Sequence, residues 1–310
     1  MKGRSKENNL KFLKAFEEYC NVACDLAFKP WCYIIDAVFK RTHYYKILTK
    51  NKIIMSTIVN EVISYKRNII KQNKDTIECD KYSDSKSEKE FSILDNLLED
   101  HGDTITDLEL LEEILVLALG GTDTSSVTAC FTALLLARHP DIQEKVYQEV
   151  KEVLGDTTRP IHYDDLPKLK YLDAVLKESV RLYPPAPIIG RLADKDVTLP
   201  SGKIIPKGTT MVFNILGLHR NPKFWGEDVE LFNPDRFLND LPHPAAYIPF
   251  SYGPRNCIGY KYGMLSLKSL LATMVSRYEF LPSPVSETFR LEFKVMLKEY
   301  NNFQIRLRQR

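Results

Sequence analysis

Apolar residues recur every three or four positions through the first part of the chain. Examples are Leu10, Leu13, Phe16, Ile54, Ile58 and Val62. This spacing places the apolar side chains on one face of a helix, and the stretch 9–70 has few helix breakers except Pro30. We therefore expect two or three helices in residues 9–70.

A different composition follows in residues 71–90, where Lys, Asp, Ser and Glu dominate and apolar residues are scarce. Such a segment cannot bury enough apolar surface to offset the conformational entropy that it would lose on ordering. We therefore expect a solvated loop over residues 71–90.

A long helix is predicted over about residues 106–138. Thr106 and Glu109 have the capping-box spacing, in which each side chain accepts a hydrogen bond from the other residue's backbone N–H. Residues 120–126, in the middle of this segment, are consecutive poor helix formers, which predicts a local distortion of the helix. The His-Pro pair after residue 138 ends the helix.

Shorter elements follow. Helical spacing of apolar residues predicts helices over residues 141–154, about 169–182 and 258–276. Residues 197–205 have the pattern of a short hairpin with a Ser-Gly turn. The segment 217–257 is dense in Gly, Pro, Asn and Asp, which is typical of a long functional loop. Together these patterns predict a mainly α-helical protein with small β-sheets.

Composition narrows the possible functions. The 310 residues include 43 Lys and Arg against 41 Asp and Glu, and this net charge of +2 gives no argument for a nucleic-acid partner. The chain starts with hydrophilic residues and has no unbroken run of about 18 apolar residues, so we expect neither a signal peptide nor a membrane-spanning helix. Six cysteines without a CxxC pair favour a reducing compartment, and the histidines lack the spacing of a zinc hydrolase.

Residues 250–259 hold the strongest candidate for chemistry. Cys257 ends a loop directly before a predicted helix, where the helix N-terminus would stabilise a thiolate that can bind a metal or act as a nucleophile. Gly253 and Gly259 allow a ligand to approach the backbone closely, and Arg255 offers a cation to an anionic group. For a lone cysteine, a buried structural role is the alternative.

The same loop, with Phe250, has the pattern FxxGxRxCxG and resembles the haem-binding loop of the cytochrome P450 family. Glu178 and Arg181 form the family's ExxR pair, Arg236 follows in Pro-Asp-Arg-Phe, and residues 120–125 are similar to the segment (A/G)Gx(D/E)T(T/S). Taken alone, an ExxR pair is usually a solvated surface pair, and a glycine-rich helix segment is often a kink or a packing site. The motifs occur in the family's order.

The resemblance implies a cytochrome P450 fold and a role for each matching residue. Cys257 would be the axial thiolate ligand of the haem iron. The haem b would be bound non-covalently, because Gly120 stands where some members carry a Glu that esterifies the haem. Asp123 and Thr124 would orient water for dioxygen activation as catalytic residues. The other cofactor-binding residues would be Arg255, Arg191, Phe250, Gly253 and Gly259, and the structural triad would be Glu178, Arg181 and Arg236.

An apolar surface next to these motifs would contact the substrate. It would comprise Leu115, Val116, Leu119, Gly120, Ile188 and Ile189, residue types that are equally typical of a protein core. Lys261 and Lys268, on the helix after Cys257, would either contact an acidic redox partner or lie on a solvated helical face.

The implied function is a haem-dependent monooxygenase that inserts one atom of dioxygen into an apolar substrate, such as a fatty acid, a hormone or a xenobiotic. Electrons would come from an NADPH-dependent reductase or a cytochrome b-type donor, at the cytoplasmic face of the endoplasmic reticulum membrane. Residues 29–31 and 39–40 are similar to the branch that includes fatty-acid omega-hydroxylases and insect microsomal members.

The resemblance covers nearly all of residues 1–310, as a partial domain. The N-terminal anchor, the first sheet and the WxxxR motif of complete members find no match, so we expect a fold that is truncated at its N-terminus. A non-catalytic truncated product or an incomplete gene model is therefore the alternative to an active enzyme. A thiol enzyme with Cys257 as nucleophile is a weaker alternative, because no histidine motif supports it.

Overall fold

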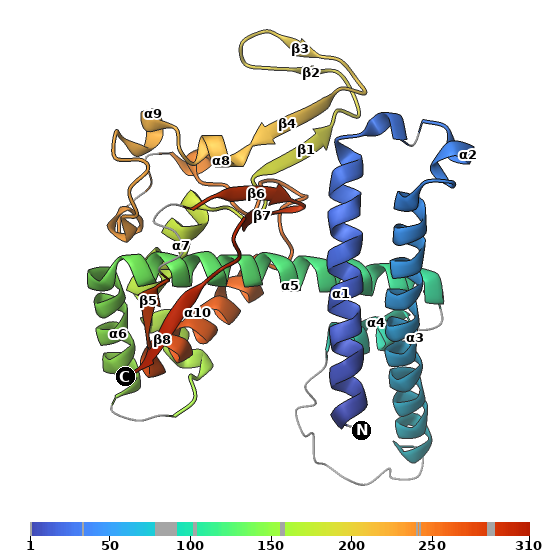
Figure 1. The fold of residues 1–310 in the computed structure, drawn as a ribbon, viewed down its shortest axis with the longest axis horizontal. Coiled ribbons are helices and arrows are strands. Elements are labelled where there is room, and N and C mark those ends of the chain that lie inside the picture. The colour runs from blue at the N-terminus through green and yellow to red at the C-terminus, as the bar shows by residue number, and fades with distance from the viewer. Residues whose placement is uncertain are drawn as a thin grey trace. The chain divides into compact units, whose positions relative to one another are not determined.

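The computed structural model describes residues 2–32, 34–77, 92–101, 104–155, 159–239, 241, 243–283 and 289–310 (Figure 1). The chain divides into two compact units, Met1–Gly120 and Gly121–Arg310, and each is described by itself. Helices dominate, and the strands of the described residues form small two-stranded sheets. The predicted mainly helical fold class with small sheets is confirmed.

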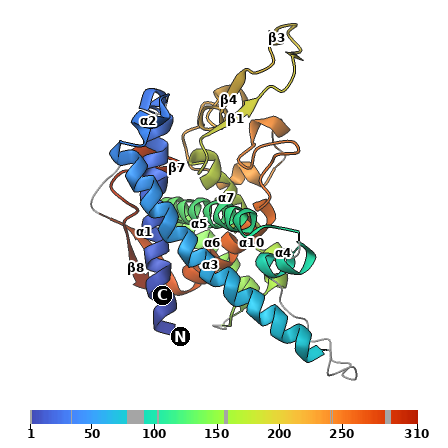
Figure 2. The same cartoon turned by 90° about the vertical axis from the view of Figure 1, so that its right-hand side faces the viewer.

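The first unit is built around two long helices, α1 (Lys2–Ala27) and α3 (His43–Ile77), which lie side by side (Figures 1 and 2). Two short elements, η1 (Pro30–Cys32) and α2 (Asp36–Phe39), lie between them in the sequence, and α4 (Ile93–His101) follows. The buried cluster of this unit combines α3, α4 and the start of the next helix through Val59, Ile63, Leu98, Leu110 and Leu111.

Helix α3 extends further than the sequence analysis expected. It ends at Ile77, so the first part of the segment 71–90 is helical instead of a loop. Lys and Gln, which are frequent there, are good helix formers, and each residue added to an existing helix gains a hydrogen bond. The remainder of the expected loop, residues 78–90, lies outside the described residues.

Helix α5 covers Asp107–Arg138 and begins with the predicted capping box. The Thr106 N–H donates to Glu109 Oε2 at 2.9 Å, and the Glu109 N–H donates to Thr106 Oγ1 at 3.2 Å. These two bonds satisfy backbone donors that a helix N-terminus otherwise leaves unpaired.

The predicted distortion in the middle of α5 is wrong, because the helix runs without interruption through residues 120–126. The hydroxyls of Ser126 and Thr128 donate to the carbonyls of Asp123 and Thr124, both at 2.9 Å, so these side chains are satisfied without opening the helix. Each of the two glycines costs about 1 kcal/mol of helix propensity, and burial of several residues in the second half of α5, such as Phe131, Leu135 and Leu136, at about 1.5–3 kcal/mol each, outweighs that cost.

Helix α5 is also long and apolar enough to cross a membrane by length and composition, with a mean hydropathy of 1.4 over a window that is 17% buried. The expectation of no membrane-spanning helix rested on the lack of an unbroken apolar run; α5 meets the criterion of length and composition because its interspersed Gly, Ser and Thr lower the mean hydropathy only slightly. The core helix of a soluble protein passes the same test, and residues 131–137 are buried in the second unit, so this is weak evidence for a membrane span.

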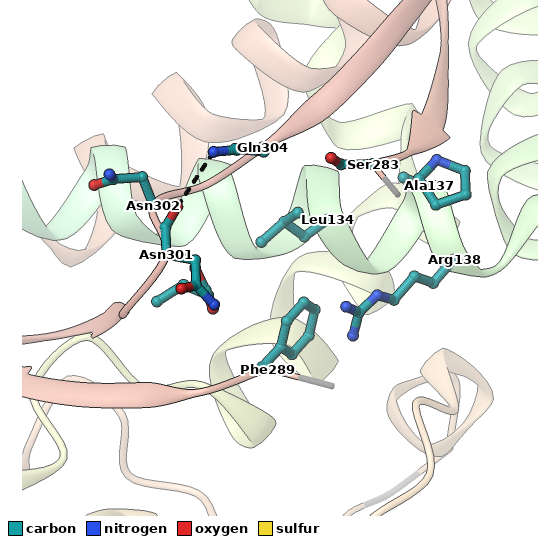
Figure 3. Close-up of a pocket in the computed structure, with 10 residues that line it drawn as sticks. Leu134, Ala137, Arg138, Ser283, Phe289, Asn301, Asn302 and Gln304 are labelled. Carbon is teal, nitrogen blue, oxygen red and sulfur yellow. Dashed lines mark hydrogen bonds between the residues drawn. The ribbon is translucent and has the colours of Figure 1, made fainter. Parts of the chain in front are cut away.

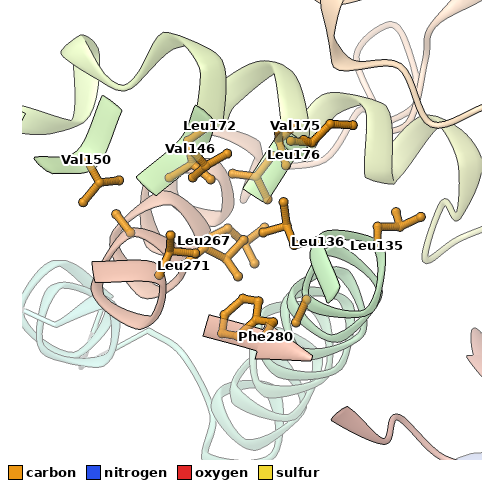
Figure 4. Close-up of a cluster of buried hydrophobic side chains, with 14 of the residues drawn as sticks. Leu135, Leu136, Val146, Val150, Leu172, Val175, Leu176, Leu267, Leu271 and Phe280 are labelled. Carbon is orange, nitrogen blue, oxygen red and sulfur yellow. The ribbon is translucent and has the colours of Figure 1, made fainter. Parts of the chain in front are cut away.

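The core of the second unit packs the end of α5 against α6 (Pro140–Leu154), α7 (Lys170–Leu182) and α10 (Tyr260–Arg277), as Figure 4 shows. The buried side chain of Gln143 joins α5, α6 and the segment that contains Phe280. The Gln143 amide of α6 donates to the carbonyls of Leu136 and Phe280 at 3.0 Å and accepts from the Phe280 N–H at 2.7 Å. The residues of this core with no exposed surface include Leu136, Val146, Leu172, Val175, Leu176 and Leu271.

Among its described residues, the second unit also has four antiparallel pairs of strands. The pairs are β1 (Ile188–Leu192) with β4 (Thr210–Asn214), β2 (Val197–Thr198) with β3 (Ile204–Ile205), β5 (Tyr278–Pro282) with β8 (Ile305–Gln309), and β6 (Leu291–Lys294) with β7 (Met296–Glu299). The pair β2–β3 is the hairpin expected at residues 197–205. Short helical elements interrupt the remaining segments: η2 (Tyr163–Lys168), α8 (Ile215–Leu218), α9 (Pro222–Trp225), η3 (Pro234–Phe237) and η4 (Pro244–Ala246).

Candidate functional site

Glu178 and Arg181 form a buried ion pair on α7. Both side chains have 0% exposed surface, and Arg181 donates from Nε to Glu178 Oε2 at 2.7 Å and from Nη2 to Glu178 Oε1 at 2.8 Å. Helical spacing of three residues places both groups on one face of α7, which is the face that packs into the core. The interpretation of this ExxR pair as a solvated surface pair is therefore wrong.

Arg236, in η3, joins this pair. Its Nε lies 3.6 Å from Glu178 Oε1, and its Nη1 and Nη2 donate to the carbonyls of Trp225 and Asp228 at 2.9 and 2.8 Å. The Asn233 N–H donates to the same Glu178 oxygen at 2.9 Å. Burial raises the pKa of the Glu178 carboxyl, and the Arg181 guanidinium opposes that shift. The structure thus brings all three residues of the expected triad, Glu178, Arg181 and Arg236, together in one charged network.

Cys257 lies at the end of the loop 250–259, directly before α10. The Cys257 N–H donates to the Phe250 carbonyl at 2.8 Å, which closes the loop. Ser251 and Gly253 have φ of 64° and 86°, so the backbone turns there through the left-handed region. The Cys257 side chain is free and exposed, which contradicts the interpretation of Cys257 as a buried structural cysteine.

Arg191 connects strand β1 to this loop. Its Nη2 donates to Ser251 Oγ at 2.6 Å and to the Arg255 carbonyl at 3.4 Å. The Arg255 side chain is exposed. Arg191 thus binds the loop that carries Arg255 and Cys257, so both residues expected to bind a haem propionate lie at this loop.

Phe250, Gly253 and Gly259, the other expected cofactor-binding residues of the loop, differ in burial and in backbone conformation. Phe250 is half-buried, and its ring lies 5.4 Å from that of Tyr260 on α10. Gly253 needs its positive φ, whereas a Cβ added at Gly259 would meet only the Cys257 sulfur, at an ordinary contact distance of 3.9 Å. Only Gly253 therefore requires glycine for a reason of backbone geometry.

The chemistry of this surface fits a haem. An exposed thiol can ligate iron, and guanidinium groups such as those of Arg191 and Arg255 pair with carboxylates. Apolar residues next to them are also exposed, as a flat apolar ligand would require. Ile258 and Leu192, which are close to Arg255 and Arg191 in the sequence, are 93% and 68% exposed, and Val212, which pairs with Gly190 of β1, is 66% exposed. The donors present on this chain are those that a haem with two propionates needs.

Asp123 and Thr124 lie on the uninterrupted part of α5. Asp123 Oδ1 is 3.6 Å from Lys298 Nζ of β7, and the two side chains are 17% and 26% exposed. The Thr124 carbonyl accepts the Thr128 hydroxyl, so the helix supplies no open backbone carbonyl at this point. The Asp123 carboxylate therefore has a cationic partner that the sequence analysis did not identify.

The expected pocket residues fall into both units. Leu115 packs against the buried cluster of the first unit, Val116 is 64% exposed, Leu119 is half-buried and Gly120 is exposed. In the second unit, β1 carries Ile188, which is 47% exposed, and Ile189, which is half-buried. Leu115 thus agrees with the alternative of a core position.

A separate pocket in the second unit lies away from these residues. Leu134 and Arg138 of α5 and Phe289, Asn301, Asn302 and Gln304 are among the residues that line it (Figure 3). The Arg138 guanidinium lies 3.8 Å from the centre of the Phe289 ring. None of the expected site residues contributes to this pocket.

Lys268 lies neither on a docking surface nor on a solvated helical face, so both expectations for it are wrong. Its Nζ is buried and contacts Asp173 Oδ1 of α7 at 3.0 Å and the Leu166 carbonyl of η2 at 3.1 Å. It therefore joins α10 to two neighbouring elements. The sequence alone gives no signal for the burial of Lys268, because Leu166 and Asp173 are distant from residue 268 in the chain. Lys261, by contrast, is exposed.

Comparison with known proteins gives the family. A family model described as Cytochrome P450 matches residues 2–306. The chain belongs to the cytochrome P450 family. The resemblance to the branch with fatty-acid omega-hydroxylases and insect members is also confirmed, since the relatives carry names of the P450 4 group.

Three relatives illustrate the extent of the match. The chain is 33% identical to Cytochrome P450 4d2 of Drosophila melanogaster over 98% of its own length and 62% of the relative's. It is 39% identical to Cytochrome P450 4F12 of Homo sapiens, over 69% of this chain and 42% of the relative. It is 36% identical to Cytochrome P450 4A10 of Mus musculus, over 78% of this chain and 48% of the relative. This P450 chain thus spans roughly half the length of the curated relatives that it matches.

Proposed function

We propose that this P450 chain carries the haem-thiolate site of a monooxygenase, with Cys257 as the axial ligand. The observation that carries the proposal is the exposed Cys257 thiol at the end of a loop that is closed by its own backbone and bonded to Arg191. Bound haem would supply the activation of dioxygen, with thiolate donation favouring cleavage of the O–O bond. The substrate would be an apolar organic molecule.

The residues of this chain would bind and orient the cofactor. Arg191 and Arg255 would pair with the propionates, and Phe250 would limit access of water to the sulfur. The haem would be held non-covalently, because Gly120 carries no carboxylate. The charged network would hold the core behind the loop without touching substrate.

Asp123 and Thr124 would move protons. The Thr124 hydroxyl would donate a hydrogen bond to bound water, and the Asp123 carboxylate would accept and return a proton. Lys298 would compete for this carboxylate. Leu115, Val116, Leu119, Gly120, Ile188 and Ile189 would contact the substrate.

The remaining roles follow from the family. Electrons would come from an NADPH-dependent reductase or a cytochrome b-type donor, and the protein would work at the cytoplasmic face of the endoplasmic reticulum membrane. Fatty acids are the first substrates to test.

The decisive experiment is the spectrum of the haem-loaded chain. After reduction and addition of carbon monoxide, we expect a red-shifted Soret band of the thiolate type, and we expect Cys257→Ala to abolish it. The matched control is Cys130→Ala on α5, where burial raises the pKa of the thiol and so disfavours a thiolate. A thiolate band that survives in Cys257→Ala would contradict the assignment. A chain that takes up no haem would favour the non-catalytic alternative.

A further inference from the structure

His219 is a fully buried histidine that follows α8 and has no role in the proposal above. Its backbone carbonyl accepts a hydrogen bond from Arg181 Nη1 at 2.9 Å. Its backbone N–H donates to the Ile215 carbonyl at 2.9 Å, which continues α8. The main chain of His219 is thus held by the charged network.

The side chain of His219 points to a different element. Its Nε2 accepts a hydrogen bond from the backbone N–H of Ile248 at 3.1 Å. An imidazole nitrogen that accepts must be unprotonated, so this bond requires the neutral ring with its proton on Nδ1. The ring also stacks on Tyr247, with centroids 5.2 Å apart, and the Tyr247 hydroxyl donates to the Lys177 carbonyl of α7 at 3.0 Å.

Ile248 lies two residues before the Cys257 loop (residues 250–259) and is bonded to it. Its carbonyl accepts the N–H of Ser251 at 3.1 Å, and Phe250, between them, accepts the N–H of Cys257 at 2.8 Å. Ser251 in turn holds Arg191. A displacement of Ile248 would therefore be passed to the cysteine, through its backbone bond to Phe250, and to Arg191, through Ser251.

We propose that His219 is a positioning residue that ties the Cys257 loop to the charged network. Its carbonyl accepts from Arg181, and its imidazole accepts from the backbone N–H of Ile248, two residues before the loop. Its effect on haem ligation rests on the proposed function, whereas the tie itself is a property of the chain. An aromatic residue without an acceptor would fill the same space and leave the Ile248 N–H unpaired.

The first test uses the full chain without haem and follows amide hydrogen exchange. In His219→Phe, which keeps a ring to stack on Tyr247, we expect exchange in residues 248–257 to become about tenfold faster. In His219→Gln the side-chain amide oxygen reaches about as far as Nε2, and we expect exchange within about twofold of the wild type. Peptides of α10 should not change in either variant.

A second pair of variants covers the case in which His219→Phe does not fold. His219→Asn and His219→Gln carry the same amide, but the asparagine is one methylene shorter and does not reach the Ile248 N–H. Faster exchange of the loop in the asparagine variant alone supports the tie. Equal exchange in the two variants, or faster exchange throughout the second unit, would show that His219 only fills the core and would overturn the proposal.

Haem loading then separates the two proposals. If the wild type gives the thiolate-type band with carbon monoxide, His219→Asn should lose a larger fraction of that band than His219→Gln, and equal loss would overturn the link to ligation. If the wild type gives no such band, the proposed function fails, while the exchange data still decide whether His219 holds the loop.

Discussion

The charged network and the Cys257 loop belong to the same unit but are built in opposite ways. Glu178 and Arg181 have no exposed surface, and their charges are met by side chains and by backbone groups from three segments of the chain. Cys257 is exposed, and its loop is held by a few hydrogen bonds. A buried charge cannot lose a partner without a large cost, whereas an exposed thiol can be replaced freely. The network should therefore govern stability, and the loop should govern chemistry.

The largest effect should come from Glu178→Ala. This change leaves the Arg181 guanidinium buried without its carboxylate, which costs about 3–5 kcal/mol of the free energy of unfolding. Urea unfolding measures it through the fluorescence of Trp225, which is buried with Arg181 5.0 Å from its ring, while Trp31 is 66% exposed. The control Glu144→Ala, at a half-exposed carboxylate, should cost about 1 kcal/mol or less. Equal losses of stability in Glu178→Ala and Glu144→Ala would show that the charged network does not govern stability.

A pH-dependent effect should follow at His219. Burial is the main cause that lowers the pKa of His219 from 6.5 to about 4; the nearby charges of Arg181 and Arg220 contribute to this shift, and hydrogen bonds oppose it. Between these two values the unfolded chain binds the proton and the folded chain does not, so stability is lost as the pH falls from 6.5 toward 4.

The matched measurement compares the wild type with His219→Gln across this pH range, so that the titration of Glu178 and other groups cancels. Since a pKa unit corresponds to about 1.4 kcal/mol, the wild type should lose about 3 kcal/mol relative to the variant by pH 4. Parallel stability curves for the two proteins would show that His219 titrates normally in the fold.

A smaller effect is expected from Arg191→Met. The loop loses the hydrogen bond to Ser251, so the reaction of Cys257 with a thiol reagent should become a few-fold faster, while global stability changes by about 1 kcal/mol or less. Arg308→Met, which removes an exposed pair with Glu279, is the control and should leave the thiol reaction unchanged. An unchanged rate in Arg191→Met would show that the loop does not depend on β1.

The smallest effect on stability should come from Cys257→Ala. Because the thiol is exposed, we expect the free energy of unfolding without haem to change by less than about 0.5 kcal/mol in the same urea experiment. A loss of 2 kcal/mol or more would mean that Cys257 is a structural residue after all.

Sequence patterns predicted local features well and non-local ones poorly. The capping box of Thr106 and Glu109 was confirmed because its two members are three residues apart and form their bonds within one turn. The distortion of α5 and the surface role of Lys268 were wrong, because both depend on burial. Burial is decided by segments that lie far away in the chain.

By itself, the sequence determined the family, the mainly helical fold class and the residues with which chemistry is possible, because motif spacing and helical periodicity are local properties of the chain. Tertiary structure alone decided that Glu178 and Arg181 are buried, that Cys257 is exposed, and that His219 lies between the charged network and the loop. The physical reason is that desolvation and the completion of hydrogen bonds depend on which distant segments meet.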